Sequence, residues 1–284
     1  SVIIPVFNAE KFLRKSVLSA VNQNFVSEII IVNDNSTDNS INVAYELKKL
    51  FPDKLKIVSN PSNVNVGAGK CRTIGIKEAR YDWVAFLDAD DYYYPNRFEN
   101  AVELISSKKY IDGVYEAVEN IFENENAQIT FLKTRPERYK KDSLRKKLNL
   151  FTLDYRVEPN QLFKTLINAN NGFFHFNGII IKKKLFKSVG YLNDKLRLCQ
   201  DTEVFMKLAI LGKLFPGNLD KPVAARLVHV GNRVYNNDNK LVYFTILAFI
   251  ELEKWARSNN VSSYMLSAIR KKNTLKQKLK MKWL

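Results

Sequence analysis

The chain has 284 residues, of which 46% are hydrophobic, enough for one large domain or for one domain with a smaller appended piece. No apolar run reaches the roughly 18–20 residues of a membrane-spanning helix, no signal-peptide pattern opens the sequence, and two cysteines argue against a disulfide framework. We therefore expect a cytoplasmic location. The formal net charge of +16 indicates affinity for phosphate groups on a nucleotide, a nucleic acid or an anionic lipid.

The first 110 residues alternate short apolar runs with helical patterns. We expect strands at 2–7, 28–33, 54–59 and 83–88, and helices near 10–23, 37–51, 67–80 and 96–109. Short strands that alternate with helices of roughly 10–15 residues are typical of βαβ units and of a parallel sheet. Because such crossovers are right-handed, we predict helices on both faces of the sheet.

The rhythm changes after residue 110. We predict strands at 113–122 and 127–132, a basic helical region at 137–169, a strand and a helix within 176–186, and an amphipathic helix at 201–211. From residue 238 onward the pattern indicates two helices, with the pair Asn259–Asn260 as the break between them.

Polar segments follow each of the first four predicted strands. They are "PVFNAE" at 5–10, "NDNSTD" at 33–38, "NPSNVNVGAGKCR" at 60–72 and "DADD" at 88–91. Taken alone, "NDNSTD" is also a good helix entry, and "GAG" could be a plain turn. In an open α/β sheet, however, ligands bind beyond the carboxyl ends of the strands. The convergence of four such segments therefore predicts a binding site at one edge.

Three carboxylates, Asp88, Asp90 and Asp91, lie within four positions at the end of an apolar strand. Like charges this close repel each other, and clustered carboxylates at a buried strand end are costly unless a cation compensates them. Hard oxygen ligands suit Mg²⁺ or Mn²⁺, which then bridge to substrate phosphates. The cluster therefore predicts a metal–phosphate site.

Several stretches of the sequence follow one another in the order and spacing of the motifs of a known family. They are "SVIIPVFNAEKFLRKSVLSAVNQ", "IIIVNDNSTDNS", "NVGAGKCRTIGI" and "WVAFLDADDYYYPNRFE", with later matches at 176–209 and 225–234. In these stretches the chain resembles a family 2 glycosyltransferase, a nucleotide-sugar transferase. The resemblance implies a GT-A type, Rossmann-like, mostly parallel sheet flanked by helices. It implies a domain at 1–234, with a nucleotide-sugar half at 1–110 and an acceptor half at 111–234, and a basic helical C-terminal extension at 235–284.

The resemblance also implies roles for particular residues. Those expected at the nucleotide are Pro5, Phe7, Asp34, Asn65, Arg72 and Asp88. Asp88 and Asp90 match the DxD motif, whose second acid binds the divalent metal. His229 matches a histidine near the metal in many relatives, although a surface histidine is an equal alternative. Asp201, in "QDTE", matches the acid that deprotonates the acceptor hydroxyl.

The implied reaction moves a sugar from a nucleoside-diphosphate sugar, with uridine as the expected base, onto a hydroxyl of a glycan or lipid-linked acceptor in surface polysaccharide synthesis. With one base and no nucleophilic carboxylate assigned, we expect inversion at the anomeric carbon. The segment 33–36 reads "NDNS" where Asp-Asp-Gly-Ser is commoner in the family. Because Asn33 and Asn35 change the contacts to the base, the resemblance does not identify the donor sugar. Gln200 stands where relatives frequently have Glu. We expect this substitution to change the surroundings of the catalytic Asp without loss of activity.

Other features leave alternatives open. The rings of Tyr92–Tyr94 either stack on a sugar or nucleobase or line the loop. Acceptor recognition is expected near Asn170, Asn171, Phe173, Phe174 and His175, on position alone. The basic C-terminus is either a solvated helix face or a peripheral attachment to the anionic inner face of the cell membrane. A nucleotidyltransferase and a non-catalytic nucleic-acid-binding protein are the rival classes, although no recognition motif supports nucleic acid as a partner.

Overall fold

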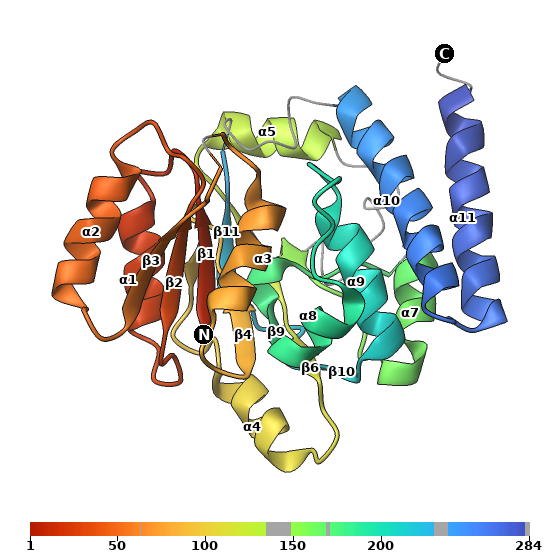
Figure 1. Cartoon of the computed structure of the whole chain (residues 1–284), viewed down its shortest axis with the longest axis horizontal. Coiled ribbons are helices and arrows are strands. Elements are labelled where there is room, and N and C mark those ends of the chain that lie inside the picture. Colours follow the sequence, from red (N-terminus) through yellow and green to blue (C-terminus); the bar gives the residue numbers. More distant parts are fainter. Residues whose placement is uncertain (63, 135–148, 169–170, 230–237, 282–284) are drawn as a thin grey trace.

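The computed structural model describes residues 1–62, 64–134, 149–168, 171–229 and 238–281. A seven-stranded sheet of order β10-β6-β9-β4-β1-β2-β3 forms the centre, and a four-stranded sheet of order β5-β11-β7-β8 accompanies it. Helices α1 and α2 lie at one side of the strands, while α7, α10 and α11 lie at the opposite end of the molecule (Figure 1).

The first half has the predicted βαβ organisation. Its strands are β1 (Val2–Val6), β2 (Ile29–Asn33), β3 (Leu55–Ser59) and β4 (Trp83–Phe86). Its helices are α1 (Leu13–Val21), α2 (Ser40–Leu50), α3 (Ala68–Glu78) and α4 (Glu99–Ser107). Strands β3, β2, β1 and β4 pair in parallel, which confirms the prediction of a mostly parallel sheet flanked by helices.

Both faces of this parallel sheet are buried, which explains why its strands read as continuous apolar runs. In β1, Ile3 belongs to an apolar cluster that includes Ile76 of α3. Its neighbours Val2 and Ile4 belong to a second cluster that includes Val17 of α1. Successive side chains of a strand point to opposite faces, so α1 and α3 cover opposite sides of the same strand.

The predicted strand at 113–122 is two strands in different sheets. β6 (Gly113–Tyr115) joins the central sheet, and β7 (Val118–Phe122) joins the smaller one. Between them, Glu116 is fully buried and its carboxylate accepts hydrogen bonds from Arg97 Nη1 at 2.8 Å and from the Asn218 amide at 3.2 Å. Arg97 and Asn218 are remote from Glu116 in the sequence, so no local sequence pattern indicates the division between β6 and β7.

The remaining strands complete the two sheets. β9 (Ile179–Lys182) runs antiparallel between β4 and β6, and β10 (Leu214–Pro216) pairs in parallel with β6. The smaller sheet also contains β5 (Tyr92–Tyr93), β8 (Leu150–Phe151) and β11 (Ala224–Val228). β11 pairs with β5, so the segment after the acidic cluster is fastened to a strand more than 130 positions away.

The strand predicted at 127–132 is wrong, because the segment belongs to helix α5 (Glu125–Thr134). The Asn124 side chain accepts a hydrogen bond from the Ala127 amide at 2.9 Å, as an N-terminal helix cap does. Ala127 and Phe131, four positions apart, are buried, while Ile129 and Leu132 are each 48% exposed. A short apolar run fits a strand or a helix equally well, and here the cap decides.

The basic helical region predicted at 137–169 is only partly described. Residues 137–148 lie outside the described ranges, β8 follows, and the helix present is α7 (Pro159–Asn168). α8 (Lys183–Val189) and α9 (Gln200–Leu211) match the predictions. α10 (Asp238–Ser258) and α11 (Ser263–Met281) confirm the two C-terminal helices and the break at 259–260, where Asn260 has a φ of 52°.

The C-terminal helices pack into the body of the fold. Phe249 and Leu252 of α10 are buried in the same apolar cluster as Phe205 and Leu208 of α9. In Figure 1, α10 and α11 lie side by side at the end of the molecule remote from α2. The division into domains at residue 234 stays a prediction. Among the described helices, none combines the length and the apolar character needed to cross a bilayer.

Candidate active site

The acidic cluster lies directly after β4 and is held by Asn177, a fully buried residue just before β9. The Asp88 amide donates to Asn177 Oδ1 at 3.1 Å, and Asn177 Nδ2 donates to Asp91 Oδ2 at 2.6 Å. The Leu227 amide of β11 donates to Asp91 Oδ1 at 2.8 Å. Two segments remote in sequence therefore fix the acidic loop.

Asp88 is engaged by Arg72, which projects from α3. Arg72 Nη2 forms an ion pair with Asp88 Oδ1, and the guanidinium lies 4.1 Å from the centre of the Phe176 ring. Burial acts to raise the pKa of Asp88, but the charge and the hydrogen bond of Arg72 oppose it, and the pKa lies below its ordinary value. Asp88 is therefore an ionised, partly covered carboxylate.

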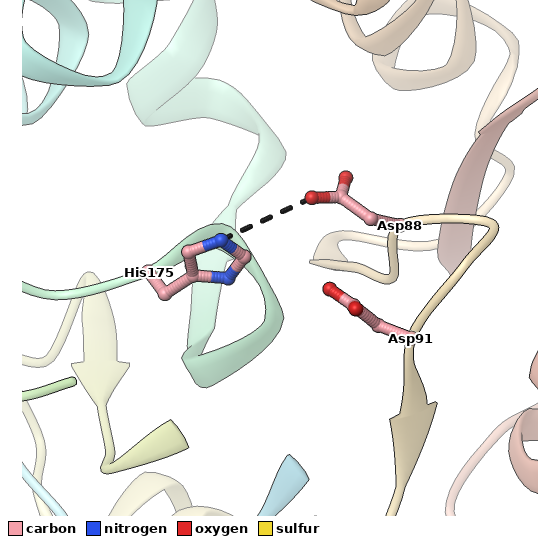
Figure 2. Close-up of side chains that lie close together, drawn as sticks. All are labelled: Asp88, Asp91 and His175. Atoms are coloured by element: carbon pink, nitrogen blue, oxygen red, sulfur yellow. Dashed lines mark ion pairs between the residues drawn. The ribbon is translucent and has the colours of Figure 1, made fainter. Parts of the chain in front are cut away.

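His175 faces the same carboxylates. Figure 2 shows Asp88 and Asp91 on the loop after β4, with His175 opposite and its Nε2 3.9 Å from Asp88 Oδ2. Burial lowers the pKa of His175 to about 3, so its imidazole is neutral. Its Nδ1 accepts a hydrogen bond from the Asn177 amide at 3.2 Å, which places the ring proton on Nε2, toward Asp88.

Asp91 is almost completely buried, at 3% exposure. Burial first, and then the charges of Asp90 and Asp88, raise its pKa well above the ordinary value. Ligand atoms of Asp88, Asp91 and His175 all lie within 4.8 Å of one another, so these three residues could hold a metal ion. The carboxylate repulsion predicted from the sequence is thus present in the fold.

Asp90 and His229 form a second acid–imidazole pair. His229 Nε2 lies 3.1 Å from Asp90 Oδ2, and the two side chains are 16% and 30% exposed, respectively. The hydrogen bond to Asp90 raises the pKa of His229. The structure therefore brings together the two residues that the resemblance assigned to the metal, although they are 139 positions apart in the chain.

Arg226 is a functional candidate that the sequence reasoning missed. It lies on β11, and its Nη1 donates to Asn120 Oδ1 at 3.0 Å. Its charge acts to lower the pKa values of Asp88, Asp91 and His229, so it offsets part of the negative charge of the acidic cluster. Arg226 lies in the stretch 225–234, which resembles the family, and this position could have identified it as a candidate.

Asp34 is 2% exposed and organises the loop after β3. Its two carboxylate oxygens accept hydrogen bonds from Asn60 Nδ2 at 2.9 Å, Asn65 Nδ2 at 2.8 Å, and the amides of Val66 and Gly67 at 2.9 and 2.7 Å. The structure thus joins Asp34 with Asn65 but not with Arg72, which lies at Asp88. Pro5 is buried in β1 beside Val32 of β2, and Phe7 is 38% exposed at the end of β1.

Asp201 lies in the first turn of α9, where its Oδ1 accepts a hydrogen bond from the Thr202 amide at 2.8 Å. Burial raises the pKa of Asp201, and the charges of Arg72 and Asp88 also act on it. Asp201 is therefore within electrostatic reach of the ion pair at the end of β4. A carboxylate with a raised pKa is better suited to accept a proton than an ordinary one.

Gln200, the departure beside Asp201, packs against the start of α3. A Cβ atom at Gly69 would lie 2.5 Å from Gln200 Cδ, so a larger residue there would displace the Gln200 amide group. Arg197, three residues earlier, donates through Nη2 to the Asn65 carbonyl at 2.9 Å. The segment that carries Asp201 is thus clamped to the loop that Asp34 shapes.

The three tyrosines after the acidic cluster make contacts within the protein. Tyr93 is buried and donates its hydroxyl to the Phe86 carbonyl at 2.6 Å, and Tyr94 donates to Glu119 Oε2 at 2.7 Å. The Tyr92 ring lies 3.5 Å from Lys15 Nζ. Of the two interpretations of this run, these contacts favour the lining of the loop.

The residues expected at the acceptor are dispersed. Phe174 is buried against Tyr115 and Phe205, at ring distances of 5.0 and 4.7 Å. Phe173 packs on the same core, His175 lies at the acidic cluster, and Asn170 is outside the described ranges. Asn171 donates to the Tyr155 hydroxyl at 3.0 Å.

The Asp34 network leads to a stability prediction. In Asp34→Ala, two amide groups and two asparagine side chains lose their acceptor. The Asn65 side chain and the Val66 amide are partly exposed and can bind water, and Asn60 Nδ2 keeps the Val64 carbonyl, while each donor left buried and unsatisfied costs about 1–3 kcal/mol. We expect the free energy of unfolding in urea to fall by roughly 2–4 kcal/mol, with Asp53→Ala, an exposed control, close to wild type. An unchanged unfolding midpoint for Asp34→Ala would contradict the structural role of this carboxylate.

Solved structures share this fold. The chain superposes on S. aureus TarS 1–349 with a TM-score of 0.61 at 19% identity, covering 95% of this chain and 70% of TarS. It superposes on the mannosyltransferase PcManGT from Pyrobaculum calidifontis, solved in complex with GDP-Man and Mn²⁺, with a TM-score of 0.57 at 14% identity, covering 95% and 72%. The fold is that of GT-A glycosyltransferases.

Sequence comparison defines the family. The model of glycosyl transferase family 2 matches residues 1–181, well over half of the chain, which therefore belongs to that family. An uncharacterized glycosyltransferase of Haemophilus influenzae is 24% identical over 275 residues, covering 94% of this chain and 83% of that protein. One of Rickettsia felis is 26% identical over 211 residues, covering 73% and 31%, so this chain spans about a third of that relative's length.

Proposed function

We propose that the chain is a metal-dependent, inverting glycosyltransferase that transfers a sugar from a nucleoside-diphosphate sugar to a hydroxyl group. The observation that carries the proposal is the electrostatic proximity of Asp201 to the Arg72–Asp88 pair. A candidate base therefore lies beside a site whose charges suit a diphosphate. Family membership and the GT-A fold support the same activity.

The residues at the end of β4 fit a divalent cation. Three carboxylates crowd there, and the pKa of Asp91 is raised by burial and by its two acidic neighbours, so a bound cation would offset their repulsion. When bound, Mn²⁺ or Mg²⁺ supplies positive charge that stabilises the leaving diphosphate.

We assign the cation to Asp90 and His229, with Asp88 and Arg72 at the adjacent diphosphate. The Asp90–His229 pair offers an oxygen and a nitrogen ligand and is more exposed than Asp91. His175 is a weaker candidate, because its Nδ1 already accepts the Asn177 amide. Mn²⁺ accepts such a mixed donor set more readily than Mg²⁺ does.

The nucleotide is proposed to lie over the ends of β1 to β3, with uridine as the base. Phe7 offers a partly exposed ring beside Pro5, and Arg72 offers a cation at the diphosphate. Asp34 and Asn65 act through the loop at 60–67, whose shape their hydrogen bond helps to set. TarS has been solved with UDP-GlcNAc and PcManGT with GDP-Man, which supports a nucleoside-diphosphate sugar without choosing the base.

The acceptor is proposed to be a glycan or lipid-linked hydroxyl, in surface polysaccharide synthesis. Asp201 accepts the proton of that hydroxyl as the oxygen attacks the anomeric carbon and the nucleoside diphosphate leaves. With one carboxylate in this role the sugar is transferred in a single displacement, which inverts the anomeric configuration. The basic residues of α11, such as Arg270 and Lys271, support peripheral contact with an anionic membrane surface.

A binding screen tests the proposal. We expect UDP-sugars with Mn²⁺ to raise the melting temperature, since a ligand at a hundredfold its dissociation constant stabilises the folded state by about 2.7 kcal/mol. Mn²⁺ alone, and UDP-sugars with EDTA, are the controls. Release of UDP on incubation with glycans supports transfer. Pyrophosphate released from UTP would instead indicate a nucleotidyltransferase, and stabilisation by oligonucleotides alone would indicate a nucleic-acid-binding protein.

A further inference from the structure

A cavity lies beside α7. It has a volume of about 350 Å³ and lies between the segment 155–158, the exposed side of α7 and Asn171. Pockets for small molecules begin at about this volume. None of the residues assigned above to the donor, the metal or proton transfer lines this cavity.

Two neighbouring segments connect the cavity with the acidic cluster. The Asp154 amide donates to the Asn171 carbonyl at 2.9 Å, and Leu153 forms an antiparallel bridge with Gly172. At the other end of the same pair of segments, the Phe151 ring lies 5.5 Å from the ring of His175. Four residues span at most about 14 Å, so the cavity lies within a few sugar lengths of His175 and Asp88.

The polar groups in the wall are those that recognise hydroxyl groups. A sugar hydroxyl both donates and accepts hydrogen bonds, and the amides of Gln161 and Asn171 offer both functions. The Tyr155 side chain is 51% exposed, and its ring provides an apolar face for the C–H side of a pyranose. Its hydroxyl is held by the bond from Asn171, which orients the ring.

The charges of the wall favour a neutral ligand. Arg156 donates from Nη2 to the Pro216 carbonyl at 2.8 Å and from Nη1 to the Gly217 carbonyl at 3.0 Å, so its guanidinium is committed to the backbone. The other cation, Lys164, is offset by the carboxylate of Glu158. A phosphate site would need an excess of available donors and cations.

We infer that this cavity is a subsite for a distal, neutral sugar unit of the acceptor, so that the protein extends an oligosaccharide rather than a single sugar. The inference rests on the proposed function. The sugar that carries the attacking hydroxyl lies at Asp201, and a unit further along the same glycan lies against Tyr155. The length of the acceptor, and not only its terminal sugar, then determines affinity.

The test combines a glycan array with titrations of the tightest-binding neutral trisaccharide and of its terminal monosaccharide as a methyl glycoside. The trisaccharide is expected to bind wild type more tightly than the monosaccharide. Tyr155→Ala and Gln161→Ala are expected to weaken the trisaccharide about tenfold and to leave the monosaccharide unchanged. Asn160→Ala, an exposed neighbour on α7 that does not line the cavity, is the matched control and should behave as wild type.

Several results would overturn the inference: no glycan bound by wild type, equal affinity for the two sugars, an equal loss in Asn160→Ala, or displacement of the trisaccharide by inorganic phosphate. Melting curves with a UDP-sugar and Mn²⁺ run beside each variant separate this inference from the proposed function. If a UDP-sugar with Mn²⁺ still raises the melting temperature but the trisaccharide and the monosaccharide bind equally well, only the subsite is refuted. Absence of any nucleotide-sugar shift in wild type refutes the donor assignment, whereas the trisaccharide titration still decides the subsite.

Discussion

Asp201→Asn is expected to lower kcat by about 10²- to 10⁴-fold, the contribution typical of a positioned general base. The substitution keeps the shape of the side chain and an acceptor oxygen for the Thr202 amide, so α9 should still begin at Gln200. The lost function is the ability to take the proton from the acceptor hydroxyl. Steady-state rates of nucleoside diphosphate release with a saturating acceptor measure the effect.

Asp194→Asn is the matched control, since Asp194 is an exposed acid a few residues before α9. Both variants should keep the wild-type melting curve and the wild-type response to a nucleotide sugar. A rate for Asp201→Asn within a factor of about two of wild type, far smaller than the loss of a general base produces, would exclude Asp201 as the base.

The pH dependence follows from the same residue. Burial raises the pKa of Asp201 above the ordinary aspartate value. A base works only when deprotonated, so activity is expected to fall as the pH decreases through this raised pKa and to level off above it. The acid limb of the kcat profile should therefore lie at a higher pH than a solvent-exposed aspartate would give.

Asp90→Ala is expected to abolish metal-dependent transfer, with a loss of about 10³-fold or more. A cation at a leaving diphosphate stabilises the transition state by several kcal/mol, and each 1.4 kcal/mol corresponds to a factor of ten in rate. EDTA should reduce the wild-type rate to a similar level, and added Mn²⁺ should restore wild type but not Asp90→Ala. Mn²⁺ binding followed by electron paramagnetic resonance measures the loss of the site directly.

Two comparisons sharpen this test. Asp53→Ala removes an exposed carboxylate in the turn before β3 and should leave Mn²⁺ binding unchanged. His229→Gln should weaken Mn²⁺ binding more than His175→Gln, because we assign the cation to Asp90 and His229, whereas His175 uses its Nδ1 to accept the Asn177 amide. The reverse order would move the metal site to Asp88, Asp91 and His175.

The clamp between distant segments explains why the C-terminal helices matter to this site. Lys195 Nζ lies 3.2 Å from Glu251 Oε2 of α10, and Arg197, two residues further along, bonds the Asn65 carbonyl. Cys199, immediately before α9, adopts a left-handed φ of 59°, and its Sγ lies 3.3 Å from Thr245 Oγ1 of α10. α10 therefore supports the segment that presents Asp201 to the acidic cluster.

Local sequence was sufficient for the parallel half of the fold and for the acids of the site. The strands β1, β2 and β4 are buried on both faces, so their apolar runs are unbroken, and polar segments follow all four strands up to β4. The same pattern placed Asp88, Asp90 and Asp91 at one sheet edge. Asp201 and His229 came from the resemblance, and the pairing of His229 with Asp90 agrees with it.

Tertiary contacts decided the rest. The run at 113–122 divides between two sheets because Glu116 is buried against Arg97. The helix at 125–134 is a different case, because its Asn124 cap is a local contact that the apolar pattern did not take into account. Asn177 and Arg226 join the site only because β9 and β11 return to the end of β4. Periodicity and motif spacing describe an element and its immediate neighbours. Which distant side chain neutralises a buried charge depends on how the sheets are connected, and no local pattern encodes that.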